Sequence, residues 1–394
     1  MGFMQPSNAH PLILPADILK IQLAIKQQFH VIKFNFAGAR SPDTRPQNPE
    51  LGTRNSEPGT RNSEPGTQNP FMEVIMEFRM LGSSGIKISP IIMGTWQAGK
   101  DMWVGIDDTE STRAIKAAYE AGITTFDTAE VYGNGHSEKI VGNALQDVRD
   151  KVVIATKVFS NHLKYRQVMD ACHRSLKNLD TDYIDLYQIH WPPGSFGGEK
   201  VPLEETMGAL TDLKAQGKIR AVGVSNFSGS QVEDAATYGR IDSLQPPYSL
   251  FWRKVETDAM PYCLDNDITL LAYSSMAQGL LTGKFGPDHA FAKGDHRFRN
   301  KLFQPENYER VQTALEKLRP MASANNITLG QLALAWIVSR PGVCAIAGAR
   351  NAEQATQNAA AGNVRLSEED LAAIDDIGKT VTDPLDDDPL MWKW

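Results

Sequence analysis

The chain has 394 residues, of which 41% are hydrophobic and 22% charged, and its formal net charge at pH 7 is −7. This composition is typical of a globular protein, and the acidic balance argues against general nucleic-acid binding. Three widely spaced cysteines, Cys172, Cys263 and Cys344, exclude a disulfide scaffold, make a metal site unexpected and favour a cytoplasmic setting. No apolar run is long enough to predict a membrane span.

Residues 1–75 differ in composition from the rest of the chain. The heptad GTRNSEP occurs at 52–58 and again at 59–65, in a stretch rich in Gly, Pro, Ser and Asn that lacks core-forming residues. We expect residues 1–75 to be a disordered, low-complexity extension and the working protein to begin at Met76 or Met80. The alternative is a functional tether with an amphipathic helix near residues 16–30.

From Met76 onward, short β-branched runs alternate with amphipathic segments of helical length. The predicted strands lie at 88–96, 123–128, 152–158, 183–190, 219–226, 242–248, 268–274 and 343–348. Helical patterns lie at 108–121, 137–146, 165–178, 203–216 and 306–325. Nearly continuous apolar strands are typical of a parallel sheet buried on both faces, so we predict an α/β protein with a closed (β/α)₈ TIM barrel over 76–394.

An open, nucleotide-binding sheet is the structural alternative. The nearest match to its GxGxxG fingerprint, at Gly133 and Gly135, has Glu138 where the third glycine belongs. The segment 279–284 has one residue too few for a phosphate-binding P-loop. Both failures favour the barrel.

Four chemically capable side chains lie at or just after the ends of three consecutive predicted strands, where a barrel gathers its catalytic loops: Asp127, Tyr132, Lys157 and His190. Each alone has a structural explanation as a cap, a packed aromatic, a solvated lysine or a core histidine. Together they suit proton donation to a carbonyl: a cation favours the phenolate, a carboxylate holds the cation, and a neutral histidine binds the carbonyl oxygen. No side chain supplies hydride, so a nicotinamide cofactor is implied.

These residues resemble the aldo-keto reductase family, barrel oxidoreductases that bind nicotinamide cofactors without a Rossmann domain. The matching motifs are GTW at 94–96, FDTAEVYG at 126–133, ATK at 155–157, DYIDLY at 182–187, GKIR at 217–220, GVSNF at 223–227, QPPY at 245–248, 273–284 and GAR at 348–350. The resemblance is greatest to the bacterial general-stress type and implies an N-terminal β-hairpin before the barrel. It makes Tyr132 the general acid, Lys157 and Asp127 its tuning pair, and His190 the group that orients the carbonyl.

The resemblance also implies a binding site for NADP(H). Its implied residues are Trp96, Ser225, Asn226, Gln245, Tyr273, Ser274, Met276, Gln278, Gly279, Leu280, Gly283, Lys284, Arg297, Gly348, Arg350, Gln354 and Asn358. Arg350 suits a 2′-phosphate beside a helix N-terminus. The chain departs from the family pattern at Ala347 and Gly348, which leaves NAD(H) open as a second cofactor.

The predicted activity is therefore the reduction of small aldehydes or ketones, with no nucleic-acid or membrane partner and with substrate, direction and oligomeric state left open. Six aromatic residues are expected near the mouth: Trp96, Trp103, Phe159, Trp191, Phe251 and Trp252. The acidic tail at 386–388 either folds over the opening or is solvated. The main alternative function is a cofactor-binding regulatory module that acts on a partner; a barrel without redox chemistry would leave the cofactor residues unexplained.

Overall fold

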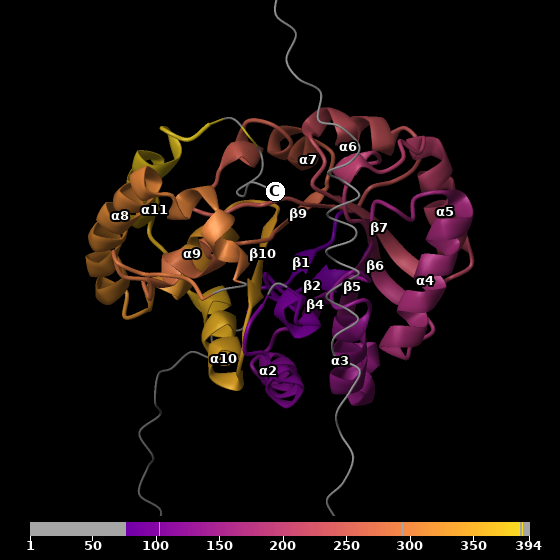
Figure 1. The fold of residues 1–394 in the computed structure, drawn as a ribbon, viewed down its shortest axis with the longest axis horizontal. Helices are drawn as coiled ribbons and strands as arrows, with labels where there is room; N and C mark the ends of the chain where they lie inside the picture. The colour runs from indigo at the N-terminus through magenta and orange to yellow at the C-terminus, as the bar shows by residue number, and fades with distance from the viewer. Residues whose placement is uncertain (1–75, 102, 293–294, 387, 389–394) are drawn as a thin grey trace, which may run out of the picture. The chain divides into compact units, whose positions relative to one another are not determined.

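The computed structural model describes residues 76–101, 103–292, 295–386 and 388 (Figure 1). The predicted extension at 1–75 and the end of the tail lie outside these residues. Eight parallel strands close into a barrel in the order β10-β3-β4-β5-β6-β7-β8-β9. They are β3 (Ile91–Gly94), β4 (Thr125–Asp127), β5 (Val153–Val158), β6 (Ile184–Ile189), β7 (Ile219–Ser225), β8 (Ser243–Gln245), β9 (Thr269–Ala272) and β10 (Val343–Gly348). The predicted TIM barrel is confirmed.

Helices surround the strands, as Figure 1 shows. They are α2 (Asp108–Glu120), α3 (His136–Leu145), α4 (Tyr165–Leu179), α5 (Leu203–Ala215), α6 (Gly229–Ala236), α7 (Met260–Asp265), α8 (Pro305–Ala324), α9 (Leu329–Val338), α10 (Ala352–Ala360) and α11 (Glu368–Thr382). In α4 the buried residues Val168, Cys172 and Leu179 recur at helical spacing and face the barrel. Every residue of β5 and β6 is buried, because the helices cover one face and the barrel interior covers the other.

An antiparallel hairpin of β1 (Arg79–Met80) and β2 (Lys87–Ile88) precedes the barrel, as predicted. Leu81, Ile86 and Ile88 of the hairpin are buried in a cluster with side chains from the barrel interior. The predicted strand 88–96 is interrupted, because Pro90 separates β2 from β3 and has no N–H to donate. The hairpin thus closes the end of the barrel at which the strands begin.

The eight barrel strands run in the same direction, so the loops that follow them open at one mouth, opposite the hairpin. The three cysteines are buried and unpaired, and burial raises the pKa of each to about 12. Of the helices in the described part of the chain, none has the length and apolar character needed to cross a bilayer. The described residues also include no group of His, Cys, Asp and Glu side chains arranged to hold a metal ion.

Candidate active site

The four predicted catalytic residues come together at the mouth. Asp127 ends β4, Lys157 lies near the end of β5, and His190 directly follows β6. The Lys157 Nζ lies 2.6 Å from the Asp127 Oδ1 and 3.5 Å from the Tyr132 Oη. The Tyr132 and His190 rings meet edge to face, with their centroids 5.7 Å apart. The side chains are therefore close enough to act on one substrate group.

Lys157 is fully buried and its ammonium group has three acceptors. Besides Asp127 and Tyr132, it donates to the backbone carbonyl of Thr128 at 2.7 Å. An ammonium group has three N–H donors, so this set of acceptors matches its protonated form. Burial lowers the pKa of Lys157, and the charge of Asp127 opposes that shift. The geometry thus supports a charged lysine directly beside the Tyr132 hydroxyl.

Two amides hold the other oxygen of Asp127. Its Oδ2 accepts hydrogen bonds from Gln245 at 2.8 Å and from Gln188 at 3.4 Å. Gln188 is fully buried in β6 and was not predicted as a site residue. An amide within a fully buried strand was the available signal, since such groups need a partner. These amides fix the carboxylate that faces Lys157.

Burial sets the protonation of Tyr132 and His190. Burial, and then the charge of Asp127, raise the pKa of Tyr132 well above its ordinary value. Burial, and then the charge of Lys157, lower the pKa of His190 well below its ordinary value. At neutral pH the structure therefore holds a phenol and a neutral imidazole side by side. The direction of this shift in Tyr132 is opposite to the one that a neighbouring cation alone would give.

The loop that carries Tyr132 packs tightly against the loop after β3. A Cβ added to Gly99 would lie 2.6 Å from the backbone carbon of Tyr132, so only glycine fits there. Gly133 has a φ of 60°, which favours glycine, and its N–H donates to Asp101 at 3.0 Å. The Ser137 hydroxyl, in the first turn of α3, donates to the Thr95 carbonyl at 2.8 Å, which joins the helix after this loop to the end of β3. These contacts fix the position of the phenol.

Glu130, on the same loop, joins it to the segment after β5. One carboxylate oxygen accepts from the Phe159 N–H at 2.8 Å and lies 2.9 Å from His162 Nδ1, while the other accepts from Arg174 at 3.1 Å. Glu130 is only 9% exposed. Sequence reasoning assigned it no role, because its partners are distant in the chain. It holds the backbone of Phe159, whose ring lies edge-on to His190 with centroids 5.6 Å apart.

Four of the predicted cofactor residues form a connected patch beside His190. The Ser225 hydroxyl donates to the Gln245 carbonyl at 2.8 Å, and the Tyr273 hydroxyl donates to the Asn226 side-chain oxygen at 2.8 Å. The Asn226 amide nitrogen donates to the His190 carbonyl at 3.0 Å. Asn226 has a φ of 62°, so its backbone turns sharply after β7. The structure brings amide, hydroxyl and aromatic groups to one surface.

The segment after β9 contains the predicted cofactor residues from Ser274 to Lys284. It forms a short 3-10 helix, Ala277–Thr282, with left-handed φ values at Gln278 (54°) and Gly279 (98°). Leu280 is fully buried, so its side chain belongs to the core and only its backbone is left for a ligand. Consecutive left-handed residues turn this backbone sharply at the mouth, an arrangement that can present N–H groups to an anion.

Three cations gather where this segment meets the loop after β10: Lys284, Arg297 and Arg350. The nearby carboxylate of Asp295 accepts from Arg297 at 2.9 Å and 2.5 Å. Burial and then the charges of both arginines lower the pKa of Lys284, whereas Asp295 raises it. Burial, and then Arg297, lower the pKa of Arg350. The cluster therefore has more positive than negative charge.

The members of this cluster differ in accessibility. Arg297 is 8% exposed and lies between aromatic rings, 5.0 Å from the Phe291 centroid and 5.5 Å from that of Trp103. Lys284 and Arg350 are exposed at the surface. Sequence reasoning expected all three to face a ligand, but the pairing with Asp295, two residues away, places Arg297 inside. Lys284 and Arg350 are therefore better placed to reach an anion.

The loop after β10 leads into α10. The Arg350 N–H donates to the Gln354 side chain at 3.0 Å, and Asn358 donates to the Gly348 carbonyl at 3.1 Å. Gln97, which was not predicted, also contacts this loop, since its side-chain amide donates to the Ala349 carbonyl at 2.9 Å. Gln354 and Asn358 thus shape the loop through hydrogen bonds to its backbone.

The predicted aromatic residues at the mouth divide into two groups. Trp96 lies 6.3 Å from the Tyr132 ring and 5.3 Å from the Trp103 ring, between centroids. Phe251 and Trp252 are 0% and 2% exposed and pack in the hydrophobic core, so they do not line the mouth. Their aromatic character gave no indication of which way they face. The predicted acidic tail contacts the segment between β9 and α8, where Asp386 and Asp388 lie 2.7 Å and 2.8 Å from the Lys301 Nζ.

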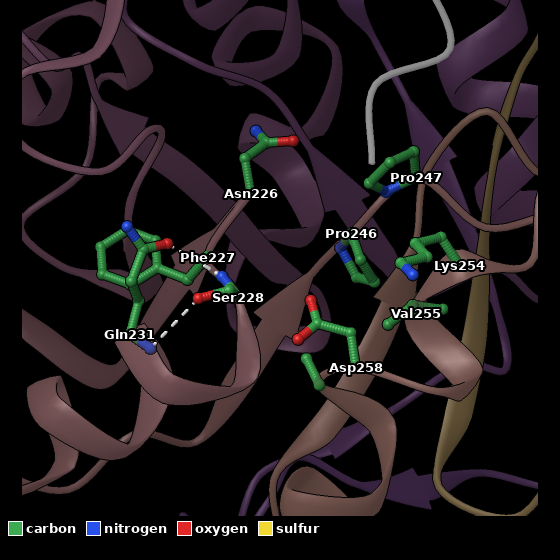
Figure 2. Close-up of a pocket in the computed structure, with 10 residues that line it drawn as sticks. Asn226, Phe227, Ser228, Gln231, Pro246, Pro247, Lys254, Val255 and Asp258 are labelled. Carbon is green, nitrogen blue, oxygen red and sulfur yellow. Dashed lines mark hydrogen bonds between the residues drawn. The ribbon is translucent and has the colours of Figure 1, made fainter. Parts of the chain in front are cut away.

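A small pocket lies beside the amide patch, between the loops after β7 and β8 (Figure 2). Its volume is about 130 Å³, and Asn226, Phe227, Pro247 and Lys254 are among the residues that line it. None of the four predicted catalytic residues lines it, so it is separate from the reacting groups.

Comparison with known proteins agrees with this geometry. Residues 90–379 match the model of the Aldo/keto reductase family. The chain is 38% identical to the Aldo-keto reductase YhdN of Bacillus subtilis, over 79% of this chain and 96% of that one. It is 34% identical to the NADH-specific methylglyoxal reductase of Escherichia coli, over 76% and 98% of the two chains. A crystal structure of an aldo-keto reductase from Klebsiella pneumoniae in complex with NADPH superposes with a TM-score of 0.62, at 30% identity over 81% of this chain and 100% of that one. The family model and these relatives show that the chain belongs to the aldo/keto reductase family.

Proposed function

We propose that this protein reduces small aldehydes and ketones with NADP(H), using Tyr132 as the proton donor. The observation that carries the proposal is the buried Lys157 ammonium group, which donates to Asp127 and also lies 3.5 Å from the Tyr132 hydroxyl. A positive charge at that position stabilises the phenolate that remains after proton donation. The remaining side chains then have distinct tasks.

The raised pKa of Tyr132 means that the phenol keeps its proton at neutral pH, and it can give this proton to the oxygen of a bound carbonyl beside Lys157. His190 is neutral, and a neutral imidazole can donate an N–H to the same oxygen without placing a second cation beside Lys157. Asp127 keeps Lys157 charged and in place through the contact of 2.6 Å. The site thus stabilises the negative charge that develops on the carbonyl oxygen.

The residues present fit a nicotinamide dinucleotide, which supplies the hydride when bound. Ser225, Asn226 and Gln245 offer the donors and acceptors that a carboxamide requires, and Tyr273 offers an aromatic ring. The excess positive charge of the Lys284, Arg297 and Arg350 cluster suits the phosphates.

The exposed Arg350 and Lys284 favour NADP(H), which has one more phosphate than NAD(H). The Klebsiella relative was crystallised with NADPH, whereas the Escherichia coli relative is named as specific for NADH. NAD(H) is therefore the alternative cofactor, and the choice depends on Arg350.

The test follows NADPH and NADH oxidation by absorbance with a reactive aldehyde, in the wild type and in Tyr132→Phe. We expect Tyr132→Phe to lower kcat by about 10²- to 10⁴-fold, the usual contribution of a general acid, and to leave NADPH affinity unchanged. Tyr238→Phe, which alters a tyrosine that is 43% exposed, is the matched control and keeps the wild-type rate. A wild-type rate in Tyr132→Phe would refute the assignment, and NADPH binding without turnover in the wild type would favour the regulatory alternative.

A further inference from the structure

One exposed aromatic residue near the mouth has a costly backbone conformation. Phe196 lies at the tip of the turn that follows β6, is 52% exposed, and has a φ of 56° and a ψ of 29°. This left-handed conformation is unfavourable for a residue with a Cβ, whereas glycine adopts it freely. Residues in this conformation persist where the surrounding structure holds them, and they cluster at functional sites, so the contacts of Phe196 need an explanation.

The turn itself does not need the aromatic ring. Gly194 and Gly197, on either side, also have positive φ values of 84° and 71°. The Gly194 N–H donates to the Glu199 carbonyl at 3.0 Å and the Gly198 N–H donates to the Ser195 carbonyl at 3.0 Å, so backbone hydrogen bonds close the turn. Glycine at position 196 would form the same backbone with less strain. The ring must therefore be favoured by what it contacts.

The contacts of Phe196 lead back to the catalytic histidine. Its ring stacks on Phe159, with centroids 5.6 Å apart and planes 17° apart, and meets the edge of Trp191 at 5.0 Å. The Phe159 ring in turn lies edge-on to His190 at 5.6 Å. The rings of Phe159, Trp191 and Phe196 form an aromatic wall that runs outward from His190, and Phe196 is its exposed end.

The inner part of the aromatic wall is held rigidly. The Phe159 backbone N–H donates to the buried Glu130 carboxylate at 2.8 Å, which joins it to the loop of Tyr132. The position of Phe159 is thus coupled to that of the proton donor. A ring stacked on Phe159 has a defined place relative to the reacting groups.

From this geometry we propose that Phe196 determines substrate specificity, by packing its ring against the part of the substrate beyond the carbonyl. An exposed aromatic face there favours aldehydes and ketones with an aromatic or flat apolar group, because such groups stack on an aromatic ring. The proposal rests on the proposed carbonyl reduction. The proposal predicts that Phe196 affects two groups of substrates differently. A two- or three-carbon aldehyde held at Tyr132 and His190 is too short to contact Phe196 at the outer end of the aromatic wall.

The test compares two aldehydes, methylglyoxal and 4-nitrobenzaldehyde, in the wild type, Phe196→Gly, Phe196→Ala and Phe196→Leu with NADPH. We expect Phe196→Gly and Phe196→Ala to lower kcat/KM for the aromatic aldehyde about tenfold, mainly through KM, as the loss of a stacked ring predicts. We expect kcat/KM for methylglyoxal to change by less than about twofold. Phe196→Leu keeps apolar bulk and recovers part of the loss.

Thermal unfolding separates this role from a structural one. Phe196→Gly and Phe196→Ala lose the same ring, but only glycine relieves the left-handed backbone, so Phe196→Gly should unfold at a higher temperature than Phe196→Ala. Their selectivity should nevertheless change equally. Phe78→Ala removes a comparably exposed ring (42%) beside the hairpin, at the opposite end of the barrel, and should alter neither aldehyde.

Two results would overturn the inference. An unchanged ratio of the two kcat/KM values in Phe196→Gly and Phe196→Ala would show that the ring does not contact substrate. An equal loss with both aldehydes, in proportion to the loss of thermal stability, would assign Phe196 a structural role. If the wild type reduces neither aldehyde, the proposed function fails and this inference fails with it, which distinguishes that case from the other two.

Discussion

Replacing Lys157 by methionine removes the charge on which the proposed chemistry depends. The side chain is fully buried, and methionine is of similar length and unbranched, so the change deletes the ammonium group with little change in shape. Its Nζ lies 3.5 Å from the Tyr132 Oη. At an effective dielectric constant of about 20, a unit charge at this distance from a phenolate is worth about 4–5 kcal/mol. We therefore expect kcat to fall about a thousandfold.

The same substitution also destabilises the fold. It leaves the Asp127 carboxylate buried with only the amides of Gln245 and Gln188, at 2.8 Å and 3.4 Å. Breaking one side of a buried ion pair costs about 3–5 kcal/mol, because an uncompensated charge remains. Lys157→Met should therefore lower the free energy of unfolding by that amount, as measured by urea denaturation at pH 7.

A double variant separates the two effects. Lys157→Met with Asp127→Asn leaves no buried charge and should regain most of the lost stability, but its kcat should stay about a thousandfold below that of the wild type. The assay measures NADPH oxidation with methylglyoxal under saturating conditions, and NADPH binding is measured separately. A kcat for Lys157→Met within tenfold of the wild type, or recovery of activity in the double variant, would refute the role given to the ammonium group.

Three further predictions concern the histidine, the cation cluster and the glycine behind the proton donor. Burial, and then the neighbouring ammonium group, lower the pKa of His190, so below about pH 6.5 the unfolded chain binds a proton that the folded chain does not. The free energy of unfolding, measured from urea midpoints, should therefore fall as the pH drops below that value. The fall should be smaller in His190→Gln, which has no imidazole to protonate. Arg350→Leu should raise the KM for NADPH about ten- to thirtyfold, which corresponds to the loss of a partly exposed hydrogen bond from a charged donor. The KM for NADH should be nearly unchanged. Equal effects on both cofactors would exclude a contact between Arg350 and the additional phosphate. A Cβ in Gly99→Ala would lie 2.6 Å from the backbone carbon of Tyr132, so this loop must shift, and kcat should drop more than tenfold. The control is Gly208→Ala, at a helical site where an added Cβ meets open space. It should leave kcat unchanged and the stability equal or higher. Unchanged kcat in Gly99→Ala would show that the position of the loop does not limit the reaction.

The amino-acid sequence alone determined the barrel and the set of reacting groups. Eight apolar runs separated by helical patterns specify a buried parallel sheet, because a strand covered on both faces must be apolar along its whole length. Residues that follow parallel strands meet at one mouth, so Asp127, Lys157 and His190 were predictable as neighbours. Tyr132 lies directly before Gly133 in the motif at 126–133, so its place in the loop after the strand of Asp127 was predictable as well.

Tertiary structure decided which way individual side chains face. Phe251 and Trp252 are core residues and Phe196 is exposed, although all three are aromatic residues in loops. The pairing of Arg297 with Asp295 places that guanidinium inside, which residue type alone does not reveal.

The long-range contacts of the site also arise only in the folded chain. Glu130 holds the N–H of Phe159, and Gln188 approaches Asp127 across the barrel interior. The periodicity of a sequence reports whether an element is buried on one face or on both, because it averages over many residues. The partner of a single polar or aromatic side chain depends on segments far away in the chain, and only the closed barrel brings them together.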